Sequence, residues 1–593
     1  MCRIAGMVTN HLQENELKSI VKVMCDALQH GGPDDEGLYC STDTRLAFGH
    51  RRLSIIDLTA NGHQPMADAR HKAWITFNGE IYNYRELKTE LQLLGAVFNT
   101  CTDTEVIIQA YLYWGTNSFN RLRGMFAFAL YDTATGAVYL VRDTTGIKPL
   151  YYYVNDNCLY FASEIRALKA AGVATVQDNR WPVWLLAFGH IPEPYTTLKN
   201  VLNVPKGHFL CWDKNNKYTI VNYTRPYIIN YITDIAEAQA GIQANLKAAI
   251  NRQLVADAAI GVFLSGGIDS SLLALLAAET RPELKTVSIF FNENAYDERK
   301  YQHTVLDKLR GNNFAHLVTQ HDFEIHLPQI LNAMDMPTTD GINSWFISKY
   351  AADDGLKTVL SGVGADELFG GYPSFNRMKI LRYLKMLPTE LLTLTKPFSR
   401  DRYKKLGFLE HNNTIADYLF LRGLFAPVDI AKATDMDENE VNKILFDEID
   451  LPQPKAYDKL YAAWLETNLY MQNQLLRDTD VMSMSHGIEV RVPFLDEDFQ
   501  AYTALIHPNI RFDNHQPKKI LIESFKNILP NAVWNRPKMG FTFPLQQWMK
   551  DNKAITDESY YRGKMAKGLI NNFNNGKIHW SRAFSLYQIQ GHV

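Results

Sequence analysis

The sequence predicts two domains of different class: an α+β domain, then an α/β domain with a parallel sheet and a helical C-terminal region. Length is the first observation, because 593 residues exceed what one hydrophobic core usually serves. The second is a change in the predicted secondary structure along the chain, from short β-rich runs to long helical patterns that alternate with short apolar strands. The third is cysteine usage, since all six cysteines lie in the first 211 residues.

The first domain is predicted from runs such as KAWITFNGEIYNY, GAVYLVRD and GHFLCWD, which are separated by Gly, Asn and Asp turns. The second begins at DIAEAQAGIQANLKAAINRQL, after which helical patterns alternate with IGVFL, TVSIFF and KTVLSG. That alternation predicts βαβ units and a parallel sheet. The composition changes between residues 215 and 235, so we take 1–225 and 226–593 as the two domains.

Composition excludes several classes of function. Apolar residues make up 46% and charged residues 21% of the chain, as in an ordinary globular enzyme. A net charge of −3 and a pI near 6.6 give no reason to expect a nucleic acid or an anionic membrane as partner. No apolar stretch could span a bilayer, the N-terminus lacks the features of a signal peptide, and the cysteines form no CxxC pair. We therefore expect a cytoplasmic protein with small-molecule partners.

The stretch FLSGGIDSS, residues 263–271, joins an apolar strand to the start of a helix. Glycines at such a turn let backbone N–H groups approach an anion at the positive end of the helix. Ser265, Ser270 and Ser271 add hydroxyl donors, and Asp269 suggests a metal that bridges to phosphates. The motif GxxxxGK(S/T) is absent, so this is not a Walker-type site. A tight turn with a capping aspartate is the plainer interpretation.

A second strand end, TVLSGVGADELFGGY at residues 358–372, has the same character and contains Asp366 and Glu367. Ligands of open parallel sheets bind outside the carboxyl ends of the strands. Asp269 and Asp366 would both lie there, and paired carboxylates suit a magnesium nucleotide better than a packed core. Two such strand ends favour a binding site over two plain turns.

These two motifs resemble the ATP-pyrophosphatase synthetase domain of glutamine-dependent asparagine synthetases. The resemblance extends from Cys2 to about Trp548 through further motifs in order, namely MCRIAG, HRRLSIIDL, FNGEIYNY, TDTEVI, RGMFAFALYD, VRDTTGIKPLYY, FASEIRAL, LLRDTDVMSMSHGIEVRVPFLD and KKILIESFKNILPNAVWNRPKMGFTFPLQQW. It implies that the first domain is a glutaminase of the N-terminal-nucleophile hydrolase type, an αββα sandwich of antiparallel sheets. Residues 375–460 carry no family motif.

The resemblance implies that Cys2 is the glutaminase nucleophile. If Met1 is removed, the α-amine of Cys2, with a pKa of about 8, can act as base for its thiol, whose ordinary pKa is about 8.5. Attack on the side-chain amide of glutamine would then give a thioester and release ammonia. An inert cysteine at a frayed terminus is the alternative, and the family residues around Cys2 favour the nucleophile.

The resemblance also assigns the residues around the nucleophile. Asn78 and the backbone of Gly79 would donate to the oxyanion of the tetrahedral intermediate. Arg52 would clamp the substrate carboxylate, and Asp103 would bind its amine with Glu80 alongside. The expected glutamine-binding residues are Arg52, Leu53, Ile55, Asn78, Gly79, Glu80 and Asp103.

In the second half, the family's chemistry is carboxylate activation. ATP adenylates the acceptor, pyrophosphate leaves, and ammonia arriving through an internal tunnel attacks the acyl-adenylate. Asp269 and Asp366 would hold Mg²⁺, and Lys518 would neutralise the departing phosphates. The expected ATP-binding residues are Leu264, Ser265, Gly266, Gly267, Asp269, Ser270, Ile289, Ser361 and Gly362.

Two pairs leave alternatives open. Lys519 competes with Lys518 for the phosphate role, and one of the two is expected to be a solvated surface lysine. Glu489 and Arg491 either contact the substrate or pair with each other, and we favour the pair because a buried arginine usually needs a carboxylate partner.

Three positions depart from the family pattern. Val363 stands where the family usually has an acid that is important for forming the acyl-adenylate, and a valine can neither take a proton nor hydrogen-bond a substrate. Gly31 replaces the usual arginine before GPD, and Ile522 stands where an arginine is common. None of the three touches the motifs of the nucleophile or the SGG turn, so they bear on the acceptor more than on the reaction type.

Three interpretations follow. The first is an asparagine synthetase that uses aspartate, glutamine and ATP, assembled as a homodimer by analogy with the family. The second is an amidotransferase of the same mechanism acting on another carboxylate, such as a sugar acid or a secondary metabolite, which Val363 supports. The third is a homologue that binds glutamine or nucleotide without turnover, and the intact Cys2, Asp269 and Asp366 argue against it.

Overall fold

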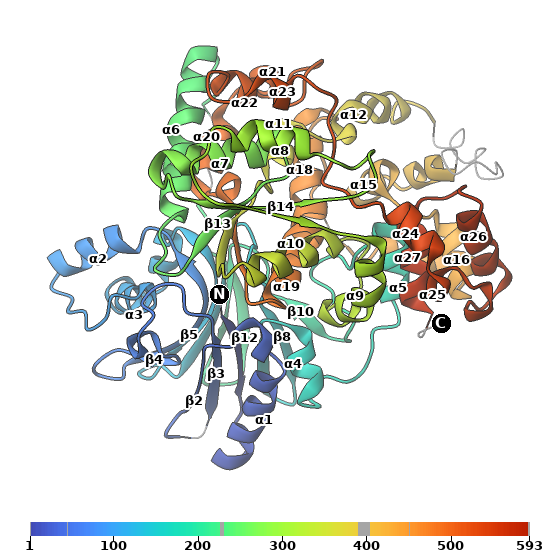
Figure 1. Cartoon of the computed structure of the whole chain (residues 1–593). Coiled ribbons are helices and arrows are strands. Elements are labelled where there is room, and N and C mark those ends of the chain that lie inside the picture. The colour runs from blue at the N-terminus through green and yellow to red at the C-terminus, as the bar shows by residue number, and fades with distance from the viewer. Residues whose placement is uncertain (1, 44, 226–229, 389–403, 450, 591–593) are drawn as a thin grey trace.

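The computed structural model describes the chain except for residues 1, 44, 226–229, 389–403, 450 and 591–593 (Figure 1). Its N-terminal half is built on two antiparallel sheets. The first has the order β10 (Val201–Asn203), β8 (Tyr151–Asn155), β9 (Cys158–Ala162), β1 (Arg3–Val8), β3 (Leu46–Arg52), β2 (Asp35–Cys40). The second has the order β12 (Tyr218–Asn222), β11 (His208–Trp212), β7 (Ala137–Arg142), β6 (Gly124–Asp132), β5 (Ala73–Ile81), β4 (Met66–Ala67).

The two sheets pack face to face with helices on both outer sides. Alternating residues such as Phe48 of β3 and Leu140 of β7 are fully buried in one cluster between the sheets. Helix α1 (Glu14–Asp26) covers the outer face of the first sheet, while α2 (Tyr84–Leu93) and α3 (Asp103–Trp114) cover that of the second. The expected αββα sandwich is therefore confirmed.

A parallel sheet forms the centre of the C-terminal half. Its order is β15 (Asn313–Leu317), β14 (Lys285–Phe290), β13 (Ile260–Phe263), β16 (Thr358–Leu360), β17 (Glu489–Arg491), and every pairing is parallel. The strands predicted at IGVFL, TVSIFF and KTVLSG are β13, β14 and β16. Because the chain moves outward in one direction from β13 to β15 and in the other from β16 to β17, the carboxyl ends of β13 and β16 flank a topological switch point.

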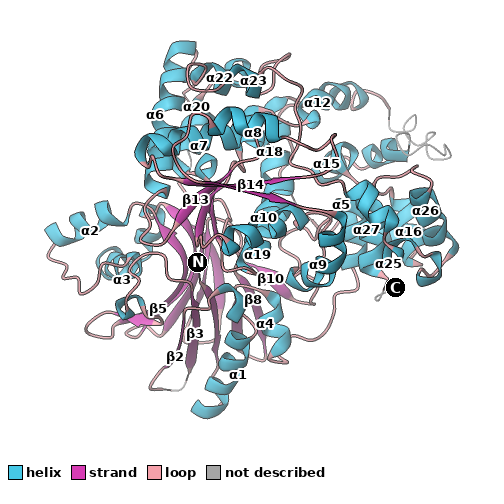
Figure 2. Cartoon of the chain, viewed as in Figure 1, coloured by secondary structure: helices cyan, strands magenta, loops and turns pink. Residues whose placement is uncertain are grey.

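Helices cover both faces of this sheet (Figures 1 and 2). One face carries α6 (Ile235–Gln253), α7 (Ile268–Thr280), α20 (Glu497–Leu505) and α22 (Lys519–Ser524). The other carries α10 (Ile342–Asp353) and α19 (Arg477–Met484), which lie between the parallel sheet and the N-terminal half. Helix α6 occupies the predicted run, with the side chain of Asp234 capping its first turn.

The remaining described helices lie around these layers. Within residues 375–460, where the sequence has no motif, the described residues are largely helical and pack near α5 (Trp181–Phe188) of the N-terminal half. The other helices are α4 (Ile165–Ala170), α8 (Arg299–Leu306), α9 (Gln320–Ala333), α11 (Ala365–Phe369), α12 (Pro373–Leu384), α15 (Thr414–Arg422), α16 (Pro427–Thr434), α17 (Glu438–Phe446), α18 (Lys459–Leu465), α21 (Pro508–Arg511), α23 (Asn531–Trp534), α24 (Leu545–Asp551), α25 (Lys553–Thr556), α26 (Lys564–Asn574) and α27 (Trp580–Ile589).

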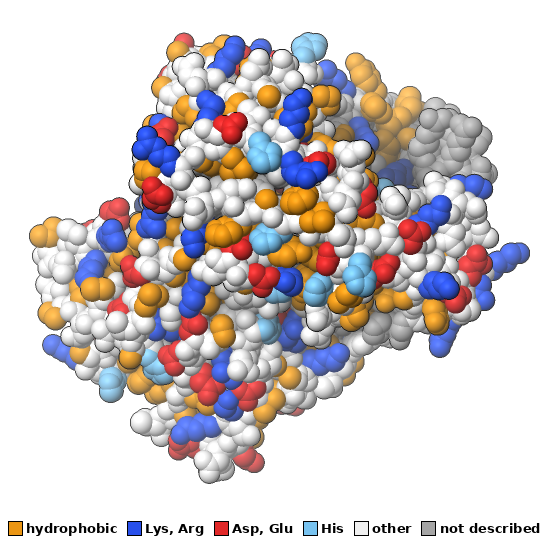
Figure 3. Space-filling model, in the orientation of Figure 1, with side chains coloured by type: hydrophobic (Ala, Val, Ile, Leu, Met, Phe, Trp, Pro, Cys, Tyr) orange, Lys and Arg blue, Asp and Glu red, His pale blue; other side chains and the backbone are white. Residues whose placement is uncertain are grey.

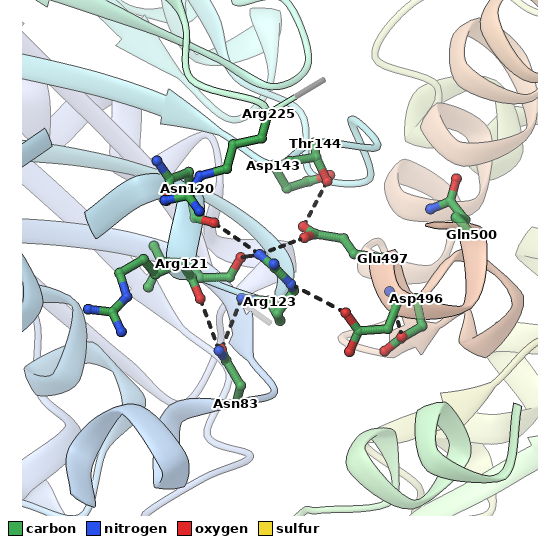
Figure 4. A network of polar contacts seen from close by, with 12 residues as sticks. Asn83, Asn120, Arg121, Arg123, Asp143, Thr144, Arg225, Asp496, Glu497 and Gln500 are labelled. Atoms are coloured by element: carbon green, nitrogen blue, oxygen red, sulfur yellow. Dashed lines mark hydrogen bonds and ion pairs between the residues drawn. The ribbon is translucent and has the colours of Figure 1, made fainter. Parts of the chain in front are cut away.

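Polar contacts join the two halves at the edge of their interface (Figure 4). Glu497, at the start of α20, lies 3.1 Å from the guanidinium of Arg123 and accepts a hydrogen bond of 2.7 Å from the hydroxyl of Thr144. Gln500, one turn further along α20, donates to the hydroxyl of Thr145 at 2.9 Å. The boundary that we place between 225 and 226 adjoins residues 226–229, which lie outside the described residues.

One face of the molecule shows no strong segregation of charge. On the face in Figure 3, basic and acidic side chains are mixed rather than gathered into a patch of one sign. Among the described helices, none combines the length and the apolar character that crossing a membrane requires.

A buried ion pair stabilises the last strand of the parallel sheet. Nε of Arg491 lies 2.5 Å from Oε1 of Glu489, and both side chains are almost completely excluded from solvent. Nη1 of Arg491 also donates to the carbonyl oxygens of Gln253 and Val255 at 2.7 and 2.6 Å. Of the two alternatives for this pair, the structure shows the internal ion pair.

We expect Glu489→Gln to destabilise the protein by about 3–5 kcal/mol, because it leaves the buried guanidinium without the carboxylate it contacts most closely. The free energy of unfolding in urea measures the loss. Glu279→Gln is the matched control, since Glu279 pairs with Lys247 at the surface and its loss should change stability by less than about 1 kcal/mol. Equal effects of the two substitutions would contradict the prediction.

Candidate active sites

A cavity in the N-terminal half collects most of the residues expected to bind glutamine. It lies where the start of β1, the segment after β3 and the start of α3 converge. It is lined by Cys2, Arg52, Leu53, Ile55, Ile56, Gly62, Gln64, Phe77, Gly79, Glu80, Thr102, Asp103 and Thr104. Of the expected residues, only Asn78 is not part of this lining.

The buried side chain of Cys2 is part of the lining of this cavity. It donates to the carbonyl oxygen of Leu53 at 3.9 Å, and burial raises its pKa to about 11. A thiol in this state is protonated at neutral pH, so it needs a base before it can act as a nucleophile. Met1, whose removal would expose the α-amine as that base, lies outside the described residues.

Asn78 has an amide without a partner. It lies on β5 with its side chain fully buried, and neither its nitrogen nor its oxygen forms a hydrogen bond within the part of the chain that the structure describes. An unsatisfied buried amide costs about 1–3 kcal/mol, which a ligand that accepts its N–H would recover. At the next position, any side chain on Gly79 would lie 2.1 Å from the carbonyl oxygen of Met125, so only glycine fits.

Opposite charges lie on the wall of the same cavity. The guanidinium of Arg52 is held by the carbonyl oxygens of Asp57 and Thr59 at 2.5 and 2.8 Å. Asp103 accepts from the backbone N–H of Ile81 at 3.0 Å, and burial raises its pKa to about 6. Burial, with the charges of Glu489 and Asp103, also raises the pKa of Glu80. One cation and two carboxyls complement the carboxylate and ammonium groups of a free amino acid.

The second site lies at the switch point of the parallel sheet. Ser265 and Ser270 place their hydroxyl oxygens 2.9 Å apart across the turn after β13. Gly266 has a φ of +81°, and Gly267 is the N-cap of α7, so the turn ends at the positive end of a helix. A Cβ on Gly362 would lie 2.8 Å from that of Asp269, so glycine permits the segment after β16 to meet α7.

Three charged side chains meet between these strand ends. Nζ of Lys518 lies 2.5 Å from Oδ2 of Asp269 and 2.5 Å from Oδ1 of Asp366. Burial lowers and the two carboxylates raise the pKa of Lys518, with a net rise, so it stays charged. Lys519 points away and pairs with Asp513 at 3.4 Å, its side chain 43% exposed. The structure therefore places Lys518, and not Lys519, between the aspartates.

The other predicted nucleotide residues lie around the same edge of the sheet. The backbone N–H of Leu264 bonds the carbonyl oxygen of Val287 at 2.9 Å, and that of Ser361 bonds the carbonyl oxygen of Arg491 at 2.8 Å. The side chains of Leu264 and Ile289 are buried. A nucleotide at this edge would meet the backbone of these residues more than their side chains.

Sequence reasoning assigned no role to three residues at this site. Nη2 of Arg536 donates to the carbonyl oxygen of Gly266 at 3.0 Å, and Nζ of Lys538 lies 2.6 Å from Oδ1 of Asp366. Glu367 is buried beside Asp366, and its Oε2 has no hydrogen-bond partner among the described residues. The signal for the first two was the pair of cations in RPKMGF, within a motif already recognised, but nothing in the sequence placed them against these strands.

The carboxyl groups of this site differ in their affinity for protons. Burial raises the pKa of Glu367 to about 7, helped by the charge of Asp366, while the hydroxyl of Tyr372 donates to it at 2.8 Å. Burial also raises the pKa of Asp269, against the pull of Lys518. For Asp366, burial acts upward but Lys518 and Lys538 outweigh it and lower the pKa. The site thus combines a fixed carboxylate with a carboxyl that can exchange a proton near neutral pH.

The paired aspartates suit a divalent cation that shares its ligands with a nucleotide. Among the described residues, no three His, Cys, Asp or Glu side chains converge as a metal site by themselves. Asp269 and Asp366 supply two hard oxygen donors, and Oδ1 of Asp269 is buried without a hydrogen-bond partner in the described part of the chain. This donor set fits Mg²⁺, which binds through one or two carboxylates and completes its shell with phosphates and water.

Comparison with known proteins agrees with two sites in one chain. Residues 1–227 match the family model of the glutamine amidotransferase domain, and residues 241–564 match that of asparagine synthase. Asparagine synthetase (glutamine-hydrolysing) 1 of Bacillus subtilis is 30% identical over 566 residues, which cover 93% of this chain and 88% of the relative. The putative asparagine synthetase of Mycobacterium tuberculosis strain H37Rv is 30% identical, with 89% and 84% covered.

A relative with a different name is also similar along its length. Amidase chry2 of Gibberella zeae is 26% identical over 617 residues, which cover 92% of this chain and 90% of the relative. The two matched domains define the class of this protein, a glutamine-dependent amidotransferase joined to a synthase. The chain belongs to the glutamine-hydrolysing asparagine synthetase family.

The pKa of Asp103 leads to a prediction about pH. If Asp103 binds the ammonium group of glutamine, kcat/KM for glutamine hydrolysis should fall by an additional factor of about ten per pH unit below the pKa of about 6, because protonation removes the charge. This fall adds to the one that protonation of the Cys2 α-amine, with a pKa of about 8, causes over the same range. Initial rates of glutamate formation between about pH 5 and 8 measure this. Asp103→Asn should have a low kcat/KM that no longer follows this titration. A wild-type profile whose slope does not steepen near pH 6 would contradict the assignment.

Proposed function

We propose that this enzyme makes asparagine from aspartate, taking nitrogen from glutamine and energy from ATP. The observation that carries the proposal is the meeting of Lys518, Asp269 and Asp366 beside the SGG turn at the switch point. The relatives named as asparagine synthetases support aspartate as the acceptor. A cytoplasmic location and a homodimer are part of the same proposal.

In the N-terminal half, the residues of the cavity would carry out glutamine hydrolysis. The α-amine of Cys2 takes the thiol proton, and the sulfur attacks the side-chain carbonyl carbon of glutamine. The unpartnered amide of Asn78 and the N–H of Gly79 would bind the oxyanion. The C–N bond then breaks, the amide nitrogen leaves as ammonia, and water releases glutamate from the thioester. Arg52 and Asp103 would orient the substrate by its charged groups.

In the C-terminal half, the acceptor would be activated at the carboxyl ends of β13 and β16. The hydroxyls of Ser265 and Ser270 and the start of α7 would bind the phosphates that leave. Mg²⁺ would be held by Asp269 and Asp366 and would supply neutralising charge to the phosphates. Lys518 adds a fixed positive charge at the same place. The aspartate carboxylate attacks the α-phosphorus, pyrophosphate leaves, and ammonia displaces AMP from the acyl-adenylate.

The direct test is the stoichiometry of the reaction. With aspartate, glutamine and ATP, the enzyme should form asparagine, glutamate, AMP and pyrophosphate in equal amounts. Replacement of aspartate by a panel of other carboxylates tests the acceptor. Failure to make asparagine from aspartate and ammonia, while another carboxylate drives pyrophosphate release, would replace this proposal by an amidotransferase for that carboxylate.

We expect Cys2→Ala to lower glutamine-dependent synthesis by more than about a thousandfold while ammonia-dependent synthesis stays close to wild type, because only the first step uses the thiol. Product formation with each nitrogen source, measured side by side, checks this. A tag that blocks the α-amine of Cys2 should have the same effect. Equal loss with both nitrogen sources would show that the two chemistries are not divided as proposed.

The second candidate acceptor, a carboxylate other than aspartate, is favoured by Val363. Its side chain is half-buried against the core cluster and offers no proton. Glu367, four residues further along the chain, is the buried carboxyl whose pKa of about 7 lets it hold and give a proton near neutral pH. We propose that Glu367 takes over the acid–base role that Val363 cannot fill, which keeps aspartate as the acceptor.

We expect Glu367→Gln to slow aspartate-dependent pyrophosphate release by about 10²–10⁴-fold, the usual contribution of acid–base assistance. Adding Val363→Glu to that variant should restore part of the rate, because it returns a carboxyl to the position where the family usually has one. The rate of glutamine hydrolysis is the control and should not follow either change. A Glu367→Gln variant with wild-type pyrophosphate release would refute this role. Val363→Glu that lowers activity in the wild-type background would favour the second candidate acceptor.

A further inference from the structure

The residue after the nucleophile is a completely buried arginine. Nε of Arg3 lies 2.7 Å from Oε1 of Glu164, and Nη1 lies 2.7 Å from Oδ2 of Asp480. The other oxygen of Asp480 lies 2.8 Å from Nζ of Lys148. These four side chains are at most 3% exposed. Arg3, Glu164 and Lys148 belong to the N-terminal half, whereas Asp480 comes from α19 of the C-terminal half.

A single carboxylate of the C-terminal half therefore neutralises two cations of the N-terminal half. Burial acts to raise the pKa of Asp480, but Arg3 and Lys148 outweigh it and lower the pKa, so Asp480 remains charged. Glu164 has other partners in addition to Arg3, since it also contacts Arg166 at 2.7 Å and His30 at 3.0 Å. The ion pair with Asp480 is thus the contact that ties Arg3 most directly to the C-terminal half.

Gly31 accounts for the path of the Arg3 side chain. A Cβ at position 31 would lie 2.7 Å from Cγ and 2.9 Å from Nε of Arg3. The arginine expected before GPD therefore cannot fit at position 31 while Arg3 lies there. In this chain the guanidinium comes instead from β1, the strand that begins directly after Cys2.

Helix α19 connects this contact with the C-terminal half. Asp478 and Asp480 are two residues apart, so their side chains leave the helix about 200° apart. Asp478 accepts a hydrogen bond from the hydroxyl of Thr338 at 2.5 Å, in the segment that leads to α10. Asp480 points the other way, to Arg3. Movement of α19 would therefore act on both sides of the interface at once.

We propose that Asp480 and Arg3 are positioning residues for Cys2, through which the C-terminal half controls glutamine hydrolysis. This inference rests on the proposed function, because control of this kind matters only if ammonia is used in the other half. Neither residue touches the substrate. Asp480 holds Arg3, and Arg3 holds the start of β1, where the nucleophile is attached.

The first test is Asp480→Asn, which keeps the shape of the side chain and removes its charge. Glutamate and pyrophosphate are measured with glutamine alone and with glutamine, ATP and aspartate. We expect the wild type to form glutamate faster when ATP and aspartate are present, and the variant to form it at least tenfold more slowly than the wild type and at one rate under both conditions. Glu497→Gln is the matched control, because Glu497 contacts Arg123 and Thr144 across the same interface but forms no ion pair with Arg3. Wild-type rates of glutamate formation in Asp480→Asn overturn the proposal.

The second test exchanges the two positions. Arg3→Gly removes the guanidinium, and Gly31→Arg alone introduces a clash, so each should lower kcat/KM for glutamine at least tenfold. The double variant has room for an arginine at position 31 and should recover at least tenfold over either single variant. If the fold-loss of kcat/KM for glutamine in the double variant equals the product of the fold-losses in the two single variants, the proposal is overturned.

Ammonia-dependent synthesis separates this inference from the proposed function. It should stay near the wild-type rate in all these variants, which also shows that they fold. A wild type that makes no asparagine from ammonia refutes the proposed function, whereas the exchange test still reports on Cys2 through glutamate formation alone. A variant that makes asparagine from ammonia but shows neither effect on glutamine refutes only the inference.

Discussion

Burying a charge between packed layers is unfavourable unless an opposite charge meets it, and this constraint governs how the two halves fit together. Asp480 enters the N-terminal half between Arg3 and Lys148, all of them almost excluded from solvent. Close by, Arg491 of β17 lies 3.5 Å from Glu80 of the glutamine cavity. A shift of one half relative to the other would separate each of these charges from its partner, and no water would be present to take the partner's place. Both active sites therefore depend on one orientation of the halves.

The same principle shapes the chemistry within each site. In the cavity of Cys2, burial raises the pKa of the thiol and of Asp103, so both depend on a partner to hold their charged forms. At the switch point, Lys518 and Lys538 keep Asp366 ionised while Glu367, its neighbour in sequence, retains a proton up to about pH 7. Adjacent carboxyls thus take different states because cations reach only one of them. The proposed division between a carboxyl that would bind the metal and one that would exchange a proton rests on this placement.

Local patterns were enough to predict the framework. Strands such as IGVFL and the helix after Asp234 were predicted because their periodicity is carried by consecutive residues, and topology then brought Asp269 and Asp366 to one edge. The position of Arg536 could not be predicted, because its partner Gly266 lies far away in the sequence. The role of Glu367 could not be predicted, because its pKa is raised only by burial in the folded protein. Gly31 shows the limit most clearly: in the sequence it was only a departure from the family pattern, whereas the structure shows that the side chain of Arg3 occupies the space.

The position of Lys518 between two aspartates also bears on the order in which ligands arrive. The ammonium group of Lys518 already pairs with Asp269 and Asp366. Because Lys518 is part of the chain, its effective concentration at this site is high, and a hydrated divalent ion from solution would have to compete with it. An ion that arrives with a nucleotide has an advantage, because the phosphates offer the lysine a new set of anionic partners. On the proposed magnesium assignment, Lys518 would act as a resident counter-ion that keeps the two carboxylates together between turnovers and would favour the entry of metal and nucleotide as one complex.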